Sequence, residues 1–357
     1  MVRLLQLCTG VMVETMKAMA LKQITNLAVN RSPLELIDMP IPVPKEHELL
    51  VKVSVCGVCH TELDEIEGRT PPSLVPIIPG HQVIGRVAQA GGAVRRFTTG
   101  DRVGIAWIHS ACGVCKFCQA GLENLCDDFK ATGRDAHGGY AEYTAVHEKF
   151  AYPIPEAFSD AEAAPLLCAG AIGYRSLRLT NMHDGDNLGL TGFGASAHLV
   201  LKMARCRFPN SKVFVFSRTE GERAFAQELG AVWAGSTEEP APEKLHAIID
   251  TTPAWTPVVE AMHSLEKGGR LVINAIRKED GDKEALLKLD YPRDLWMEKE
   301  IKSVANITRK DVEDFLKLAA EAPIRPDVHE YDLIDANTAL LELKEKRVRG
   351  AKVLRVP

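Results

Sequence analysis

Four cysteines that lie within fifteen residues constrain this chain more than any other feature. Cys112, Cys115, Cys118 and Cys126 are spaced as CxxCxxCx7C. Four thiolates at this spacing suit a tetrahedral zinc ion, and a zinc ion closed on all sides has no position left for a substrate, so the predicted role is structural. The alternatives are a ferredoxin-like iron–sulfur cluster, whose Cx2Cx2Cx3CP spacing is not matched, and unrelated core thiols.

The chain divides into two regions with different patterns of apolar residues. Before about residue 155, short runs such as LLVKVSVCG and DRVGIAWI alternate with glycine and proline, which is typical of a mostly β domain. From Asp186 onward, short apolar runs alternate with helix-length segments, and this alternation predicts a doubly wound parallel sheet. The 357 residues suffice for about two domains, each with its own core, in an α/β fold.

A glycine-containing turn, TGFGASAH, follows the apolar run NLGLTG and opens a helix. Gly192 would make the tight turn, and Gly194 would let the backbone approach a pyrophosphate. The first helical amides, from Ala195 onward, would donate to the phosphates. Ala197 stands at the third glycine position, so the motif is GxGxxA, and its place between a strand and a helix predicts a dinucleotide site.

The end of the next predicted strand bears on the choice of coenzyme. VFVFS ends in Ser217 and Arg218, where folds that prefer NAD usually place a carboxylate against the ribose hydroxyls. A guanidinium can bind a 2'-phosphate, so these residues favour NADP(H) over NAD(H). Glu220 lies nearby and weakens this interpretation, and Arg218 could instead be a solvent-facing side chain.

Three dispersed residues could form a second metal site. Cys59 and His81 lie on separate predicted turns, and Cys168 lies far along the chain. Two thiolates and one imidazole would leave the fourth position of a tetrahedral zinc ion open, as catalysis requires. Spacing alone does not select these three residues, because buried cysteines and single histidines are most often ordinary core residues.

Composition excludes several classes of function. The formal charge is -5, with 48 acidic and 43 basic residues, so nucleic acid and anionic membranes are not expected partners. No run of about 18 apolar residues predicts a membrane helix. The first fifteen residues lack the features of a signal peptide and are expected to form an extension before Met16. Nine cysteines without such a signal indicate a reducing compartment, the cytoplasm.

Taken together, these motifs resemble the zinc-containing medium-chain alcohol dehydrogenases over nearly the whole chain, from Met16 to Pro357. The resemblance rests on GVCHTEL, PGHQVIGRVAQAGG, CGVCKFCQAGLENLC, APLLCAG and TGFGASAH. It implies that Cys59, His81 and Cys168 bind a catalytic zinc ion, the Cys₂His set of that family. It also implies a GroES-like catalytic domain over 1–155 and 306–357 and a Rossmann coenzyme domain over 156–305.

The resemblance assigns further roles by position. Thr61 would bind the substrate oxygen and start a proton relay. His60 and Arg309 would contact the coenzyme pyrophosphate, and Trp107 would line the substrate pocket. Each of these four residues could also be an ordinary structural residue.

Three departures from the family pattern limit this transfer. Gln82 replaces the glutamate that commonly follows the ligand histidine, and Glu62 replaces an aspartate, with a longer arm toward that histidine. Asp64 stands where many relatives carry the relay histidine. We expect Asp64 or water to take the place of that histidine.

The activity implied by the resemblance is reversible hydride transfer between a small alcohol, aldehyde or ketone and NAD(P), with two zinc ions per chain. The reacting groups would meet in a cleft between the domains. A homodimer or homotetramer is expected, with pairing near GGRLVINAI and Ile301. The alternatives are a zinc-free quinone-reductase-like oxidoreductase, which has no use for the clustered thiols, and a noncatalytic zinc protein that senses nucleotides.

Overall fold

The computed structural model describes residues 4–6, 12–322, 324–345 and 350–357. The chain forms two compact units. The β-rich unit comprises Met1–Cys168, Thr308–Leu316 and Pro326–Pro357, and the parallel-sheet unit comprises Ala169–Ile307 and Lys317–Arg325.

One large sheet organises the β-rich unit, in the order β10-β6-β5-β4-β18-β17, with β9 also paired to β4. Its strands are β4 (Glu48–Val58), β5 (Val83–Ala90), β6 (Arg102–Ile105), β9 (Tyr143–His147), β10 (Ala151–Pro153), β17 (Val328–Asp332) and β18 (Ala351–Arg355). Leu49, Val51 and Val53 alternate along β4 and are fully buried, which is the period of a strand that faces a core. The last strand, β18, pairs antiparallel with β4.

Smaller elements complete this unit. Two further sheets contain β1 (Leu4–Gln6), β2 (Met12–Leu21) and β3 (Leu34–Pro40), and β7 (Ile108–Ser110) and β8 (Lys130–Ala131). The helical segments are α1 (His60–Ile66), α2 (Lys116–Gln119), η1 (Glu123–Leu125), η2 (Glu148–Phe150), α3 (Asp160–Pro165), η3 (Leu166–Gly170), η6 (Leu333–Asp335) and α9 (Ala336–Lys344). Of the predicted N-terminal extension, residues 1–3 and 7–11 lie outside the described residues, and β2 already begins at Met12.

The second unit is built on one parallel sheet in the order β13-β12-β11-β14-β15-β16. Its strands are β11 (Leu188–Thr191), β12 (Val213–Phe216), β13 (Trp233–Gly235), β14 (Leu245–Asp250), β15 (Leu265–Ile273) and β16 (Glu300–Ser303). All residues of β11 and β12 are buried, as strands covered on both faces must be. The predicted α/β class, a β-rich domain with a doubly wound parallel sheet, is confirmed.

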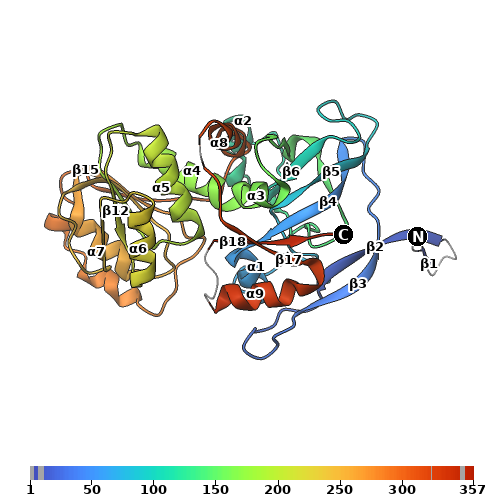
Figure 1. Ribbon diagram of the computed structural model, residues 1–357, viewed down its shortest axis with the longest axis horizontal. Helices are drawn as coiled ribbons and strands as arrows, with labels where there is room; N and C mark the ends of the chain where they lie inside the picture. The colour runs from blue at the N-terminus through green and yellow to red at the C-terminus, as the bar shows by residue number, and fades with distance from the viewer. Residues whose placement is uncertain (1–3, 7–11, 323, 346–349) are drawn as a thin grey trace. The chain divides into compact units, whose positions relative to one another are not determined.

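Helices accompany the strands of this sheet (Figure 1). They are α4 (Ala171–Thr180), α5 (Ala195–Arg207), α6 (Glu220–Glu228) and α7 (Thr256–Ser264), with the shorter η4 (Lys283–Lys288) and η5 (Tyr291–Leu295). Helix α8 (Arg309–Glu321) begins in the β-rich unit and ends in the parallel-sheet unit. No helix in the described part of the chain has the length and apolar character needed to span a membrane.

The compact units and the expected domain boundaries differ in three places, one of which is residues 306–307, expected in the catalytic domain but part of the parallel-sheet unit. Residues 156–168 belong to the β-rich unit, because α3 packs against β4 and β5. Residues 317–325 belong to the parallel-sheet unit, although the sequence motifs place the boundary before them.

Candidate metal centres and dinucleotide turn

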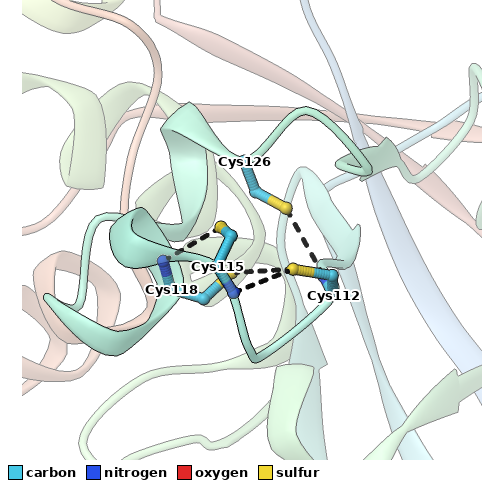
Figure 2. A group of neighbouring side chains, drawn as sticks. All are labelled: Cys112, Cys115, Cys118 and Cys126. Carbon is cyan, nitrogen blue, oxygen red and sulfur yellow. Dashed lines mark hydrogen bonds between the residues drawn. The ribbon is translucent and has the colours of Figure 1, made fainter.

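The four clustered cysteines converge around one point (Figure 2). All four Sγ atoms lie within 4.8 Å of one another. Backbone amides orient them: the N–H of Cys115 donates to Cys112 Sγ at 3.4 Å, and the N–H of Cys118 donates to Cys115 Sγ at 3.5 Å. The N–H of Cys112 donates to Cys126 Sγ at 3.5 Å. The fold therefore prearranges four sulfur atoms for one ion.

The protonation of these thiols fits a metal site. Hydrogen bonds from the backbone of Val114 and Cys115 lower the pKa of Cys112 to about 7. Burial raises the pKa of Cys118 to about 12. Four thiolates at this distance repel one another, so full ionisation needs a cation among them. The donor set is that of a closed zinc site.

The structure also brings together the dispersed trio. Cys59 is the N-cap of α1, His81 lies just before β5, and Cys168 lies in the π-helical turn η3 that follows α3. His81 Nε2 is 3.7 Å from Cys59 Sγ and 3.3 Å from Cys168 Sγ. All three ligand atoms lie within 4.8 Å of one another.

Local geometry explains how His81 reaches the two cysteines. The preceding residue, Gly80, has φ +98°, a conformation that favours glycine. A Cβ at this position would lie 2.4 Å from the ring of Tyr140 and 2.7 Å from Cys56 Sγ. Glycine is therefore required for the tight approach that brings His81 to the trio.

Glu62 connects helix α1 to His81. Its Oε2 accepts a hydrogen bond of 2.8 Å from the N–H of Cys59, which closes a capping box, and its Oε1 lies 2.6 Å from His81 Nδ1. Both side chains are buried, Glu62 at 0% exposure and His81 at 1%. A carboxylate at Nδ1 fixes the imidazole so that Nε2 faces the thiols.

The electrostatics of the trio favour a bound cation. The hydrogen bond with Cys168, and then burial, raise the pKa of the Cys59 thiol well above its ordinary value. Burial lowers the pKa of His81, but the charges of Glu62 and Cys59 outweigh burial, so the net pKa is raised well above normal. A dication would displace these protons. The set of two sulfurs and one nitrogen suits zinc and leaves a fourth position open.

The residues that follow Cys59 lie on α1. The N–H of Thr61 donates to Cys59 Sγ at 3.4 Å, and the Thr61 side chain is half-buried. His60 is exposed, whereas Asp64 is buried and accepts a hydrogen bond of 2.5 Å from Arg69 Nε. Helix geometry places Thr61 and Asp64, three residues apart, on neighbouring positions of one face.

Sequence reasoning missed a buried carboxyl on the same helix. Glu65 is 2% exposed, and among the described residues neither of its carboxyl oxygens has a hydrogen-bond partner. Burial, and then the charge of Glu62, raise its pKa well above the ordinary value. The sequence signal that could have pointed to Glu65 is its spacing of three residues from Glu62, which places both residues on one face of a helix. Gln82 is also buried, with its side chain against Gly57.

Trp107 lies in an aromatic group within the β-rich unit. Its ring centroid is 4.7 Å from that of Phe129, and the Arg134 guanidinium lies 5.3 Å from the Trp107 ring centroid. Trp107 is 8% exposed, and its Nε1 has no hydrogen-bond partner in the part of the chain that the structure describes. Arg134, which the sequence did not single out, pairs with Asp135 at 2.7 Å.

The glycine turn has the geometry that the motif predicts. Gly192 has φ +77°, and a Cβ there would lie 2.8 Å from Thr251 Oγ1. Gly194 is exposed, with no atom within 4 Å of an added Cβ, so its backbone is open to a ligand. Helix α5 begins at the next residue, Ala195, and Ala197 is fully buried. The helix N-terminus can therefore receive an anion.

The end of β12 carries charges of both signs. Ser217 is buried and donates a short hydrogen bond to the carboxylate of Glu222, which the sequence did not single out. Arg218 is exposed. Arg223 Nη1 donates to the carbonyl oxygens of Ser217 at 2.8 Å and Arg218 at 3.1 Å, and so fixes this turn.

Arg309 is joined to the loop of the four cysteines. Its backbone N–H and its Nε each donate to Glu123 Oε1 at 2.8 Å. Glu123 lies between Cys118 and Cys126 in sequence and is 2% exposed. Arg309 is the first residue of α8, so the four-cysteine loop holds the start of this helix.

Comparisons with known proteins give consistent matches. Residues 45–156 match the family model of the alcohol dehydrogenase GroES-like domain. The chain is 42% identical over 331 residues to a probable alcohol dehydrogenase, AdhA, of Mycobacterium tuberculosis, which covers 91% of this chain and 94% of that protein. An alcohol dehydrogenase of Geobacillus stearothermophilus is 31% identical over 336 residues, 91% of this chain and 96% of its own.

A solved structure extends the comparison to the fold. The cobalt- and zinc-bound thermostable alcohol dehydrogenase from Pyrobaculum aerophilum superposes with a TM-score of 0.84 at 23% identity, over 96% of this chain and 99% of that chain. At this level of identity, the match shows a shared fold.

Proposed function

Because this chain belongs to the family of zinc-containing medium-chain alcohol dehydrogenases and is an NAD(P)-dependent alcohol oxidoreductase, we propose which of its residues bind the metal ions and the coenzyme and which transfer the proton. The observation that carries the proposal is the convergence of Cys59, His81 and Cys168 on one point. Its test is aldehyde reduction followed by NAD(P)H absorbance, in the parent and in a variant without Cys59.

The trio would hold a catalytic zinc ion, and Cys112, Cys115, Cys118 and Cys126 a structural one. When bound, the catalytic zinc supplies Lewis acidity that eases deprotonation of an alcohol, and the nicotinamide takes the hydride. The carboxylate of Glu62 keeps the His81 ring in the orientation that ligation needs.

The chain's own residues would move the proton. During alcohol oxidation, Thr61 Oγ1 receives the proton of the substrate hydroxyl and passes its own proton on. Asp64 lies on the same helix face, and its carboxylate, held by Arg69, would receive the proton before it reaches solvent. Reduction uses the same path in reverse.

An Asp64→Asn variant tests this relay. We expect kcat for alcohol oxidation to fall by about ten- to a hundredfold near neutral pH, because the amide cannot take up a proton. The rate should then rise more steeply with pH than in the parent, since solvent must accept the proton. The measurement is kcat between about pH 6 and 9. Glu67→Gln is the control, because Glu67 also pairs with Arg69. If Asp64→Asn has the same pH profile as the parent, water and not Asp64 receives the proton from Thr61.

We further propose that the coenzyme is NADP(H). The glycine turn and the α5 N-terminus would bind the pyrophosphate, with His60 and Arg309 as further contacts. The exposed guanidinium of Arg218 would bind the 2'-phosphate. The carboxylate of Glu222 already accepts a hydrogen bond from the Ser217 hydroxyl and is therefore less available to the ribose hydroxyls of NAD(H), which supports NADP(H) as the coenzyme.

Replacement of Arg218 by alanine tests the coenzyme choice. We expect the KM for NADPH to rise by about ten- to a hundredfold, because one charge-assisted contact to the phosphate is lost. The KM for NADH in the same variant should change by less than about threefold and is the internal control. A parent enzyme with a specificity constant for NADH more than about tenfold above that for NADPH would contradict the proposal.

The substrate would be a small alcohol, aldehyde or ketone, bound beside Trp107. A homodimer or homotetramer is proposed, with pairing along β16. This strand lies at the edge of the parallel sheet, and all of its residues are exposed, including Ile301 at 40%. An open strand edge offers main-chain hydrogen bonds to a second copy.

The eight cysteines of the described residues are free thiols, which supports a cytoplasmic location.

A further inference from the structure

A buried ion pair lies in the parallel-sheet unit and includes no residue of either candidate metal site. Lys278 Nζ contacts the carboxylate of Asp250, with side-chain exposures of 8% for the lysine and 0% for the aspartate. Lys278 Nζ also donates to the carbonyl oxygens of Thr252 at 2.9 Å and Ala254 at 2.8 Å. Burial of two charges is costly, and these added hydrogen bonds give the pair a defined geometry.

The pair lies where the strand order of the parallel sheet reverses. Asp250 is the last residue of β14 and is in register with Thr191, the last residue of β11. Thr191 Oγ1 donates to Asp250 Oδ1 at 2.6 Å. From β11 the chain continues to β12 and β13 on one side, whereas β14, β15 and β16 lie on the other. Open parallel sheets bind ligands at the carboxyl ends of their strands at this reversal.

The residues that Lys278 holds support the glycine turn. Thr251 Oγ1 donates to the carbonyl oxygen of Thr191 at 2.9 Å, and a Cβ at Gly192 would lie 2.8 Å from that same Oγ1. The segment that starts at Thr251 is therefore packed against the turn. Lys278 holds this segment through hydrogen bonds to the carbonyl groups of Thr252 and Ala254.

The segment that carries Lys278 also touches the start of α5. It follows β15, and its residue Asn274 donates through Nδ2 to Ser196 Oγ at 3.3 Å. Asp282, farther along, accepts hydrogen bonds from the N–H groups of Trp255 at 3.0 Å and Thr256 at 2.7 Å. Two loops and the helix N-terminus are thus joined around the turn.

We propose that Lys278, through its buried pair with Asp250, is a positioning residue for the dinucleotide: it holds residues 251–254 against the glycine turn so that the turn is preformed for the pyrophosphate. This inference rests on the proposed function, since it takes the turn as the coenzyme site. Preformed geometry lowers the cost of ordering the site when the ligand binds.

Lys278→Met, which keeps an unbranched side chain only one atom shorter and removes its charge, tests the proposal in the full-length, zinc-loaded protein. The readouts are the Kd of NADPH and of NADH from coenzyme fluorescence, and the split between coenzyme KM and kcat. We expect both Kd values to rise by about tenfold or more, whereas kcat at saturating coenzyme stays within about threefold of the parent. Lys278→Arg should restore most of the affinity. Lys283→Met is the matched control, because Lys283 lies on the same segment and is exposed.

A double variant separates positioning from stability. In Asp250→Asn/Lys278→Met no buried charge is left without a partner, so the thermal stability should recover relative to Lys278→Met, but coenzyme affinity should not. If Lys278→Met does not fold, the double variant decides. The inference is overturned if Lys278→Met, or the double variant where Lys278→Met does not fold, binds the coenzyme as tightly as the parent does. A parent that binds neither coenzyme overturns the proposed function and this inference with it.

Discussion

Replacement of Cys59 by alanine is expected to abolish alcohol oxidation and aldehyde reduction, with kcat/KM lower by about a thousandfold or more. The physical reason is the loss of one of the three proposed protein ligands of the catalytic zinc ion, since Lewis-acid stabilisation contributes several kcal/mol and a thousandfold corresponds to about 4 kcal/mol. The thiol caps α1 by accepting from the Thr61 N–H, so a small loss of stability is also expected. The measurement is NAD(P)H-dependent turnover together with zinc content.

Cys56→Ala is the matched control for this experiment. Cys56 is a fully buried thiol on β4, three residues before Cys59, and it is not part of the trio. It should keep turnover and zinc content close to those of the parent. Coenzyme binding should survive in Cys59→Ala, because Cys59 is not among the residues proposed to contact the coenzyme and the glycine turn lies in the parallel-sheet unit. Turnover within about tenfold of the parent in Cys59→Ala would contradict the assigned role of the trio.

Replacement of Cys115 by serine is expected to cause the largest loss of stability. Without one of its four sulfur ligands the proposed closed site should no longer hold a zinc ion, and binding of structural zinc contributes directly to folding. We expect a loss of about 3 kcal/mol or more, which corresponds to an apparent Tm lower by roughly 6–12 °C. Scanning calorimetry and zinc analysis measure the two effects.

The same variant should weaken coenzyme binding through a defined contact. Glu123 lies in the four-cysteine loop and holds Arg309 by two hydrogen bonds, so disorder of the loop would release the proposed pyrophosphate contact. Cys206→Ser is the control, because Cys206 is an exposed free cysteine outside both clusters. Cys115→Ser with the Tm and zinc content of the parent would show that the cluster carries no structural ion.

The sequence predicted those parts of the molecule whose signals are local. The four cysteines are close in the chain, and the glycine turn adjoins a strand and a helix, so spacing alone was informative. The alternation of strands and helices likewise predicted the parallel sheet. By contrast, Cys59, His81 and Cys168 converge only because β4, β5 and α3 pack together. The resemblance to a family, and not spacing, selected those three residues.

The contacts that the sequence did not predict join segments that are distant in the chain. Glu123 and Arg309 are separated by 186 positions, and Lys278 and Asp250 by 28. Neither pair has a periodicity or motif that a single sequence reveals. Glu65 has a local signal, its helical spacing from Glu62, but its burial could be known only from the fold.

The most direct test of the account is the zinc content per chain of the purified, chelator-washed protein, measured by plasma mass spectrometry. We expect about two zinc ions per chain, one at the four cysteines and one at Cys59, His81 and Cys168. One ion per chain, or none, would contradict the central claim that these two groups are both metal centres.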